Sequence, residues 1–179
     1  MKKESVKLAG ILCIITLVAA LLLACVNKIT APQIEAAAHL ASQNAMKKIL
    51  SEAESFEKID ENISKGMKGT ELVGYCVSVL TKGFGGNIEM MVAIGNDDKV
   101  KGIEILSHSE TPGLGAKAAT ESFKDSFKDK NPRLNIVKIA TDSPDEAQAI
   151  TGATVTSKAI ADGISHAFDM VEKIEGGNK

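Results

Sequence analysis

The sequence predicts an α+β fold: an antiparallel sheet packed with helices, preceded by one N-terminal transmembrane helix. Three observations support this fold class. Residues 8–26 carry no charge, residues 72–79 place alternate side chains on one apolar face and are followed by two further strand-like runs up to residue 106, and residues 157–174 repeat apolar residues at helical spacing. A chain of 179 residues has room for one domain of ordinary size besides the anchor.

The uncharged run at residues 8–26 is close to the roughly 20 apolar residues that span a bilayer. Signal-peptide cores are shorter, typically about 7–15 residues. Several lysines precede the run within residues 1–7, whereas Lys28 alone follows it closely. Because positive charge collects on the cytoplasmic side, we expect residues 1–7 in the cytoplasm and the rest of the chain outside the cell membrane.

Cys25 offers an alternative to this single-pass anchor. Residues 22–25 (Leu-Leu-Ala-Cys) resemble a bacterial lipoprotein box, which would mean cleavage before Cys25 and lipidation of its thiol. We favour an uncleaved anchor, because the apolar run continues to its end without the short, polar-flanked form of a processed signal. Both alternatives tether the domain to membrane lipid and give it the same topology.

Residues 27–70 are predicted to form a stalk helix and a connection. The helix is expected to start at residues 30–32 (Thr-Ala-Pro), because proline is favoured in a first turn. Residues 33–50 are rich in helix formers with a thin apolar stripe. Residues 51–70 are polar and rich in Lys, Glu and Gly, which indicates a surface connection.

Residues 71–179 are predicted to form the extracytoplasmic domain. Strands are expected at residues 72–79, 87–94 and 100–106, the last two joined by a hairpin turn, and together they form an antiparallel meander. A helix at 116–128, a short strand at 134–139 and a final helix at 157–174 follow. Residues 143–146 look like a turn.

Composition and spacing exclude several kinds of function. The net charge is −2 and no basic run is interleaved with aromatic residues, so we expect no nucleic-acid partner. The cysteines form no C-x-x-C pair and the histidines lack metal-ligand spacing, so no metal site is predicted. His108 and Glu110 lie close in sequence but have no nucleophile to pair with, so we expect no catalytic acid–base site.

Two loops lie where a strand gives way to a helix, at residues 107–115 and 149–158. Amide groups at a helix N-terminus suit a phosphate, so the amides near Thr156 and Ser157 are candidates to hold one, with Lys158 to neutralise charge. A threonine hydroxyl there can bond covalently to a phosphoryl group. Taken alone, these hydroxyls are better explained as helix caps, and residues 111–113 as a turn.

Four segments together change that balance. They are residues 26–32 (Val-Asn-Lys-Ile-Thr-Ala-Pro), 83–88 (Gly-Phe-Gly-Gly-Asn-Ile), 108–117 (His-Ser-Glu-Thr-Pro-Gly-Leu-Gly-Ala-Lys) and 151–157 (Thr-Gly-Ala-Thr-Val-Thr-Ser). With them the chain resembles the FMN-binding family, in particular the G subunits of Rnf electron-transport complexes. The C subunits of sodium-pumping NADH:quinone reductases are more distant relatives. The resemblance runs nearly end to end.

The resemblance implies a covalent flavin. In this family the last threonine of the Ser/Thr-Gly-Ala-Thr motif carries FMN through a phosphoester bond that a flavin transferase makes from FAD; by position this is Thr154. An acidic residue often lies three places before the first Ser/Thr of this motif, where this chain has Gln148. The expected cofactor-binding residues besides Thr154 are Glu110, Thr111, Leu114, Gly115, Thr151, Gly152, Ala153, Thr156, Ser157 and Lys158. Of these, Thr156 and Ser157 are also expected to cap the helix.

The resemblance also implies a function. We expect an electron-carrier subunit of a membrane complex that couples ferredoxin:NAD electron transfer to ion translocation, with other membrane and iron–sulfur subunits as partners. One alternative is a covalent-FMN domain of another extracytoplasmic reductase, or of the sodium-pumping NADH:quinone reductase. An alternative of another class is a non-redox, membrane-tethered lipoprotein or scaffold in which both loops are only turns.

Overall fold

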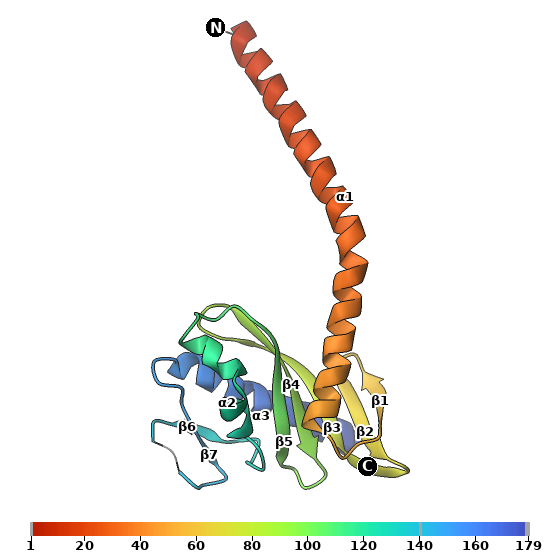
Figure 1. Cartoon of the computed structure of the whole chain (residues 1–179), viewed down its shortest axis with the longest axis vertical. Coiled ribbons are helices and arrows are strands. Elements are labelled where there is room, and N and C mark those ends of the chain that lie inside the picture. Colours follow the sequence, from red (N-terminus) through yellow and green to blue (C-terminus); the bar gives the residue numbers. More distant parts are fainter. Residues whose placement is uncertain (1, 140, 178–179) are drawn as a thin grey trace. The chain divides into compact units, whose positions relative to one another are not determined.

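The computed structural model describes residues 2–139 and 141–177. Residue 1 of the predicted cytoplasmic segment 1–7 lies outside the described residues. So do residues 140, 178 and 179 of the predicted domain 71–179. The chain divides into two compact units, Met1–Ala41 and Ser42–Lys179. An N-terminal apolar helix is followed by an antiparallel sheet with helices, which confirms the predicted fold class (Figure 1).

Helix α1 runs without interruption from Lys2 to Ile49. It contains a stretch long and apolar enough to cross a membrane, and residues 8–26 are exposed throughout. The predicted helix start at residues 30–32 is wrong, because the helix continues through Pro32. The Thr30 hydroxyl does not cap a helix here; it donates to the Val26 carbonyl one turn back, at 3.0 Å.

The sheet has five strands in the order β1-β2-β3-β4-β5, and every neighbouring pair is antiparallel. The strands are β1 (Ser55–Asp60), β2 (Ile63–Lys68), β3 (Glu71–Lys82), β4 (Asn87–Gly95) and β5 (Val100–His108). The predicted meander is confirmed as β3, β4 and β5. Residues 55–68, predicted as a connection, instead extend the sheet, and β1 is an edge strand with mostly exposed side chains.

The two faces of the sheet are covered by different helices. Helix α3 (Thr154–Gly177) packs Ile160 and Ile164 against Val77 and Val92 on one face (Figure 1). On the other face, the end of α1 places Ile49 in a smaller apolar cluster, whose remaining buried members are Ala45, Leu50, Cys76, Met91 and Ala93. Strand β4 is therefore buried on both sides, and it forms the centre of the domain.

Between β5 and α3 the chain forms four short elements: η1 (Gly115–Ala119), α2 (Glu121–Asp125), β6 (Asn135–Val137) and β7 (Glu146–Gln148). The predicted helix 116–128 is split, because Thr120 is extended, with φ −74° and ψ 144°. The predicted strand 134–139 contains the shorter β6, which pairs in parallel with the unpredicted β7. Three-residue strands are too short to show a periodic pattern.

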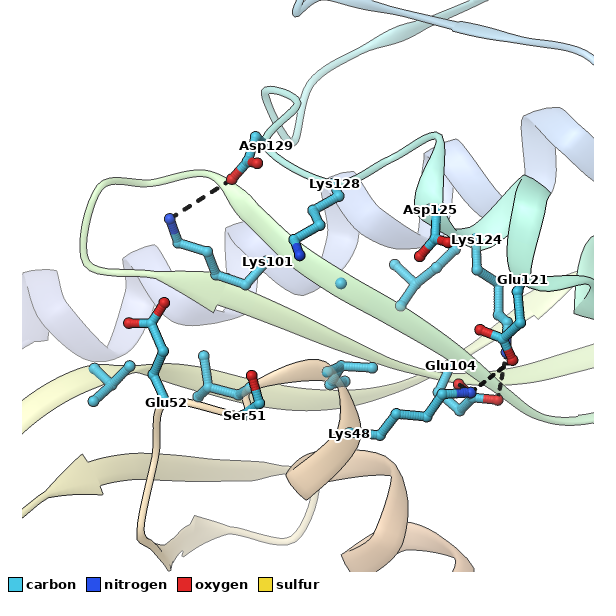
Figure 2. A pocket seen from close by; sticks show the side chains of 15 residues that line it. Lys48, Ser51, Glu52, Lys101, Glu104, Glu121, Lys124, Asp125, Lys128 and Asp129 are labelled. Atoms are coloured by element: carbon cyan, nitrogen blue, oxygen red, sulfur yellow. Dashed lines mark hydrogen bonds and ion pairs between the residues drawn. The ribbon is translucent and has the colours of Figure 1, made fainter.

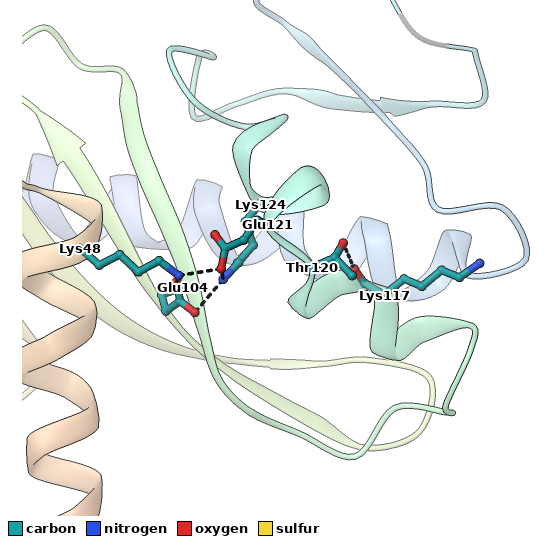
Figure 3. A network of polar contacts seen from close by, with 6 residues as sticks. All are labelled: Lys48, Glu104, Lys117, Thr120, Glu121 and Lys124. Carbon is teal, nitrogen blue, oxygen red and sulfur yellow. Dashed lines mark hydrogen bonds and ion pairs between the residues drawn. The ribbon is translucent and has the colours of Figure 1, made fainter.

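A charged cluster joins the end of α1 to β5 and α2 (Figure 3). The buried Lys124 ammonium lies 2.7 Å from Glu104 Oε1 and 2.9 Å from Glu121 Oε1. Lys48 Nζ lies 2.8 Å from Glu104 Oε2. The Glu104 and Glu121 carboxylates raise the pKa of Lys48. The cluster borders a charged cavity of about 280 Å³ (Figure 2).

Candidate functional site

The β3–β4 turn and the loop after β5 meet at the first turn of α3, and the Glu110 carboxylate lies between these three segments. Oε1 accepts hydrogen bonds from the Phe84 amide at 2.8 Å and the Gly85 amide at 3.2 Å. Oε2 accepts one from the Thr156 hydroxyl at 2.9 Å. The side chain is 7% exposed. One carboxylate therefore joins the β3–β4 turn, the loop after β5 and the start of α3.

Two glycines leave room for this carboxylate. A Cβ atom at Gly83 would lie 2.1 Å from Glu110 Oε1, and one at Gly115 would lie 2.2 Å from Oε2. Both distances are far below van der Waals contact. Any larger residue would have to displace the carboxylate from its donors, so the site requires glycine at these two positions.

A mainly apolar cavity of about 430 Å³ opens beside Glu110. Its size lies in the range of small-molecule sites, roughly 300–1,000 Å³. Three of its apolar side chains are exposed although they are large: Phe84 at 75%, Leu114 at 46% and Val155 at 54%. The remaining lining residues are Glu110, Thr111, Gly115, Gly152, Ala153, Thr154 and Thr156. Exposed apolar groups around a cavity are typical of a ligand or partner site.

The start of α3 supplies the polar end of this cavity. The first helical residue is Thr154, whose side chain is exposed. The Ser157 amide donates to the Ala153 carbonyl at 3.0 Å, which is the first α-helical hydrogen bond, so the amides of residues 154–156 precede the helical ladder. Gly152 has φ +80°, a left-handed conformation that turns the chain into the helix.

Thr156 and Ser157 do not cap the helix, because both lie inside its first turn, and this correction follows from α3 beginning at Thr154. Their side chains are buried at 1% and 0% exposure. The Ser157 hydroxyl accepts from the Ile150 amide at 2.9 Å and donates to the Ala153 carbonyl at 3.0 Å. It thereby fixes the preceding loop on the helix.

Most of the predicted site residues come together. The cavity is lined by eight of them: Glu110, Thr111, Leu114, Gly115, Gly152, Ala153, Thr154 and Thr156. Thr151 lines a separate cavity of about 290 Å³, Ser157 is internal and Lys158 is exposed. The sequence did not single out Phe84 and Val155 as lining residues. Phe84 could have been found from the sequence, because it is a bulky aromatic residue among the glycines of residues 83–86.

Other reactive groups lie away from this cavity. Burial raises the pKa of the Cys76 thiol to about 12. His108 Nδ1 accepts a hydrogen bond from the Glu110 amide at 3.2 Å, so this imidazole helps to shape the loop. Among residues 2–139 and 141–177 there is no group of three or more His, Cys, Asp or Glu side chains that could hold a metal ion.

Comparisons with known proteins agree with this geometry. Residues 83–169 match the FMN-binding domain family and residues 1–49 match the RnfG N-terminal region. These matches and the apolar helix define a membrane-associated protein with an FMN-binding domain. The cavity fits such a ligand, because it combines an apolar wall for a ring system with helix amides for a phosphate.

Full-length relatives identify the family more closely. The G subunit of the proton-translocating ferredoxin:NAD(+) oxidoreductase complex of Clostridium ljungdahlii is 38% identical, over 89% of this chain and 88% of that protein. The G subunit of the Na(+)-translocating complex of Acetobacterium woodii is 34% identical, over 94% and 92%. The chain belongs to the family of G subunits of ion-translocating oxidoreductase complexes.

Solved structures share the fold. NqrC of Shewanella oneidensis aligns with a TM-score of 0.53 at 19% identity, over 66% of each chain. The C subunit of the Na(+)-translocating NADH-quinone reductase of Parabacteroides distasonis aligns with a TM-score of 0.51 at 22% identity, over 59% of this chain and 57% of that one. At these identities the likeness is one of fold.

Proposed function

We propose that this protein is an electron-carrying subunit of a membrane complex that couples electron transfer between ferredoxin and NAD to ion translocation, and that its carrier is FMN bound covalently to Thr154. The observation that carries the proposal is the position of Thr154. Its exposed side chain is the first of α3 and lines the 430 Å³ cavity. The relatives of the chain, G subunits of ferredoxin:NAD(+) oxidoreductase complexes, align with it along nearly their whole length.

Attachment would require a flavin transferase that uses FAD. The Thr154 oxygen would form a bond to the flavin-side phosphorus, the pyrophosphate bond of FAD would break, and AMP would leave together with the hydroxyl proton. The amides of the first turn of α3 would donate hydrogen bonds to the phosphate oxygens. Phe84, Leu114 and Val155 would cover the ring, and the attached flavin would accept and release electrons.

The position in the membrane follows from charge. We place residues 8–26 across the bilayer, residues 1–7 in the cytoplasm and the sheet domain outside, because lysines collect before the apolar run. Protease added to spheroplasts should then degrade the unit that begins at Ser42. Degradation in inside-out vesicles and not in spheroplasts would contradict this orientation.

The attachment site is tested by mass. Full-length protein co-expressed with a flavin transferase should gain the mass of FMN less one water, and fragmentation of the tryptic peptide 139–158 should place that mass on Thr154. Thr154→Ala should abolish the gain. Thr141→Ala is the matched control, because it removes an exposed hydroxyl of the same peptide that lies outside the cavity and outside the attachment motif, and it should leave the gain intact. Covalent flavin on Thr154→Ala at the wild-type level would refute the assignment.

The second candidate is the FMN-carrying subunit of a sodium-pumping NADH:quinone reductase, which the shared fold favours. The G subunits match at higher identity and over a larger part of both chains, so we place the protein with them. Co-purification from the native membrane distinguishes the two. Iron–sulfur and membrane subunits that oxidise reduced ferredoxin should accompany the tagged chain, and a quinone-reducing assembly would favour the second candidate.

A further inference from the structure

Among the residues that the structure describes, no cation pairs with the buried Glu110 carboxylate. It is 7% exposed and lines the cavity, and none of the ion pairs among the described residues includes it. Its compensation comes from two backbone amides and one hydroxyl. Neutral donors reduce the field of a carboxylate without cancelling it, and screening by salt is weak at a buried position.

We propose that the Glu110 carboxylate sets the reduction potential of the flavin, by holding a fixed negative charge in the wall of the cavity that receives the ring. The inference rests on the proposed function. Reduction adds electrons to the flavin, and a neighbouring negative charge opposes that addition. Glu110 therefore lowers the potential of the carrier. It is a positioning residue as well, because its three hydrogen bonds hold the cavity loops together.

A single variant separates the charge from the scaffold. In Glu110→Gln, the amide oxygen can take the place of Oε1 and accept from Phe84 and Gly85. The amide nitrogen can take the place of Oε2 and donate to the Thr156 oxygen, since a hydroxyl both donates and accepts. The Thr156 hydrogen can then bond to the carbonyl four residues back, as the Ser157 hydroxyl already does. Shape and contacts are kept, and only the charge is lost.

A second variant moves the potential in the opposite direction. Thr156→Val removes the one donor that reaches Oε2, and it keeps nearly the same side-chain shape. The carboxylate is then less compensated and its field at the cavity is stronger. A purely structural role for Glu110 predicts no pair of opposite shifts. Glu89→Gln is the matched control, because Glu89 is exposed and is not among the residues that line the cavity.

The test is a spectroelectrochemical titration of full-length, transferase-loaded protein in detergent, with the covalent flavin content measured by mass for each variant. Glu110→Gln should favour the reduced flavin at least tenfold, which is 59 mV for a one-electron couple. Thr156→Val should shift the potential downward, and Glu89→Gln should leave it unchanged. The Glu110→Gln shift should persist at high salt, because the charge is buried.

Three results would overturn the inference. The first is an unchanged potential in fully loaded Glu110→Gln. The second is a folded Glu110→Gln chain that takes up no flavin, which would assign the carboxylate to attachment. The third applies if Glu110→Gln does not fold, and it is an unchanged or raised potential in Thr156→Val. All three are distinct from failure of the proposed function, in which the wild-type chain itself acquires no flavin on Thr154.

Discussion

At Gly163 helix α3 packs against side chains of β3 and β4, and replacing this glycine with alanine tests that contact. A Cβ atom there would lie 2.2 Å from Met90 Cε and 2.5 Å from Thr81 Cγ2. The methionine methyl is the end of a flexible side chain and can move. The threonine methyl cannot move easily, because it is β-branched and belongs to the paired strand β3.

Two effects of opposite sign decide the outcome. Alanine is favoured over glycine in a helix interior by about 1 kcal/mol. Inserting a methyl group into a packed contact costs typically about 1–3 kcal/mol, and a stiff neighbour at 2.5 Å places Gly163→Ala near the upper end. We expect a net loss of about 1–2 kcal/mol in the free energy of unfolding. Gly176→Ala, in the same helix with nothing within 4 Å, should gain up to about 1 kcal/mol.

The free energies are measured on the full-length chain in detergent by pulse proteolysis across a urea series, which reports the folded fraction of the domain. Gly163→Ala should lower the urea midpoint and Gly176→Ala should leave it equal or higher. Equal or greater stability of Gly163→Ala would refute the reasoning, since the helix would then not be held against Thr81 as described.

Two further predictions concern buried groups. Lys124→Met should lower the free energy of unfolding by about 1–3 kcal/mol, because Glu104 loses its ion pair with the buried Lys124 ammonium and keeps the one with the more exposed Lys48. In a double-mutant cycle with Glu104→Gln, the loss of stability in the double variant should be smaller than the sum of the losses in the two single variants. Cys76 should resist iodoacetamide in the folded chain through pH 9 and react on unfolding, with the cysteines of α1 replaced by serine. Because folding raises the pKa of this thiol to about 12, its stabilising contribution is complete below the unfolded value of about 8.5 and is lost as pH rises toward 12. Rapid labelling of the folded chain would contradict the burial.

Strands with a buried face could be predicted from the sequence. Residues 72–79, 87–94 and 100–106 lie within β3, β4 and β5, because these runs are rich in apolar and β-branched residues and are separated by turn residues. Strands β1 and β2 could not be predicted, because most of their side chains are exposed or only half-buried. Polar residues at such positions are equally compatible with a surface loop. Strand β2 joins the sheet by backbone pairing with β3, and β1 joins it by pairing with β2.

The site was predictable in part. Only the family resemblance indicated that the two loops form one site. In the structure, eight of the residues predicted in this way line one cavity. The role of Glu110 could not be predicted. Its donors are the amides of Phe84 and Gly85, which leave no mark on side-chain identity, and a hydroxyl 46 residues away. The helix boundary at Thr154 was missed by three residues for a similar reason: threonine and valine do not distinguish a loop from a first turn.

The three segments joined by Glu110 are distant in the chain, at separations of 26 and 46 residues, and α3 follows the other two in sequence. A nascent or truncated chain can present the Thr154 hydroxyl, but it cannot present the cavity wall beside it. Only a domain whose C-terminal helix has docked offers both. Cofactor attachment that depends on this wall would therefore act as a maturation checkpoint, and a coloured protein would be one that had already finished folding.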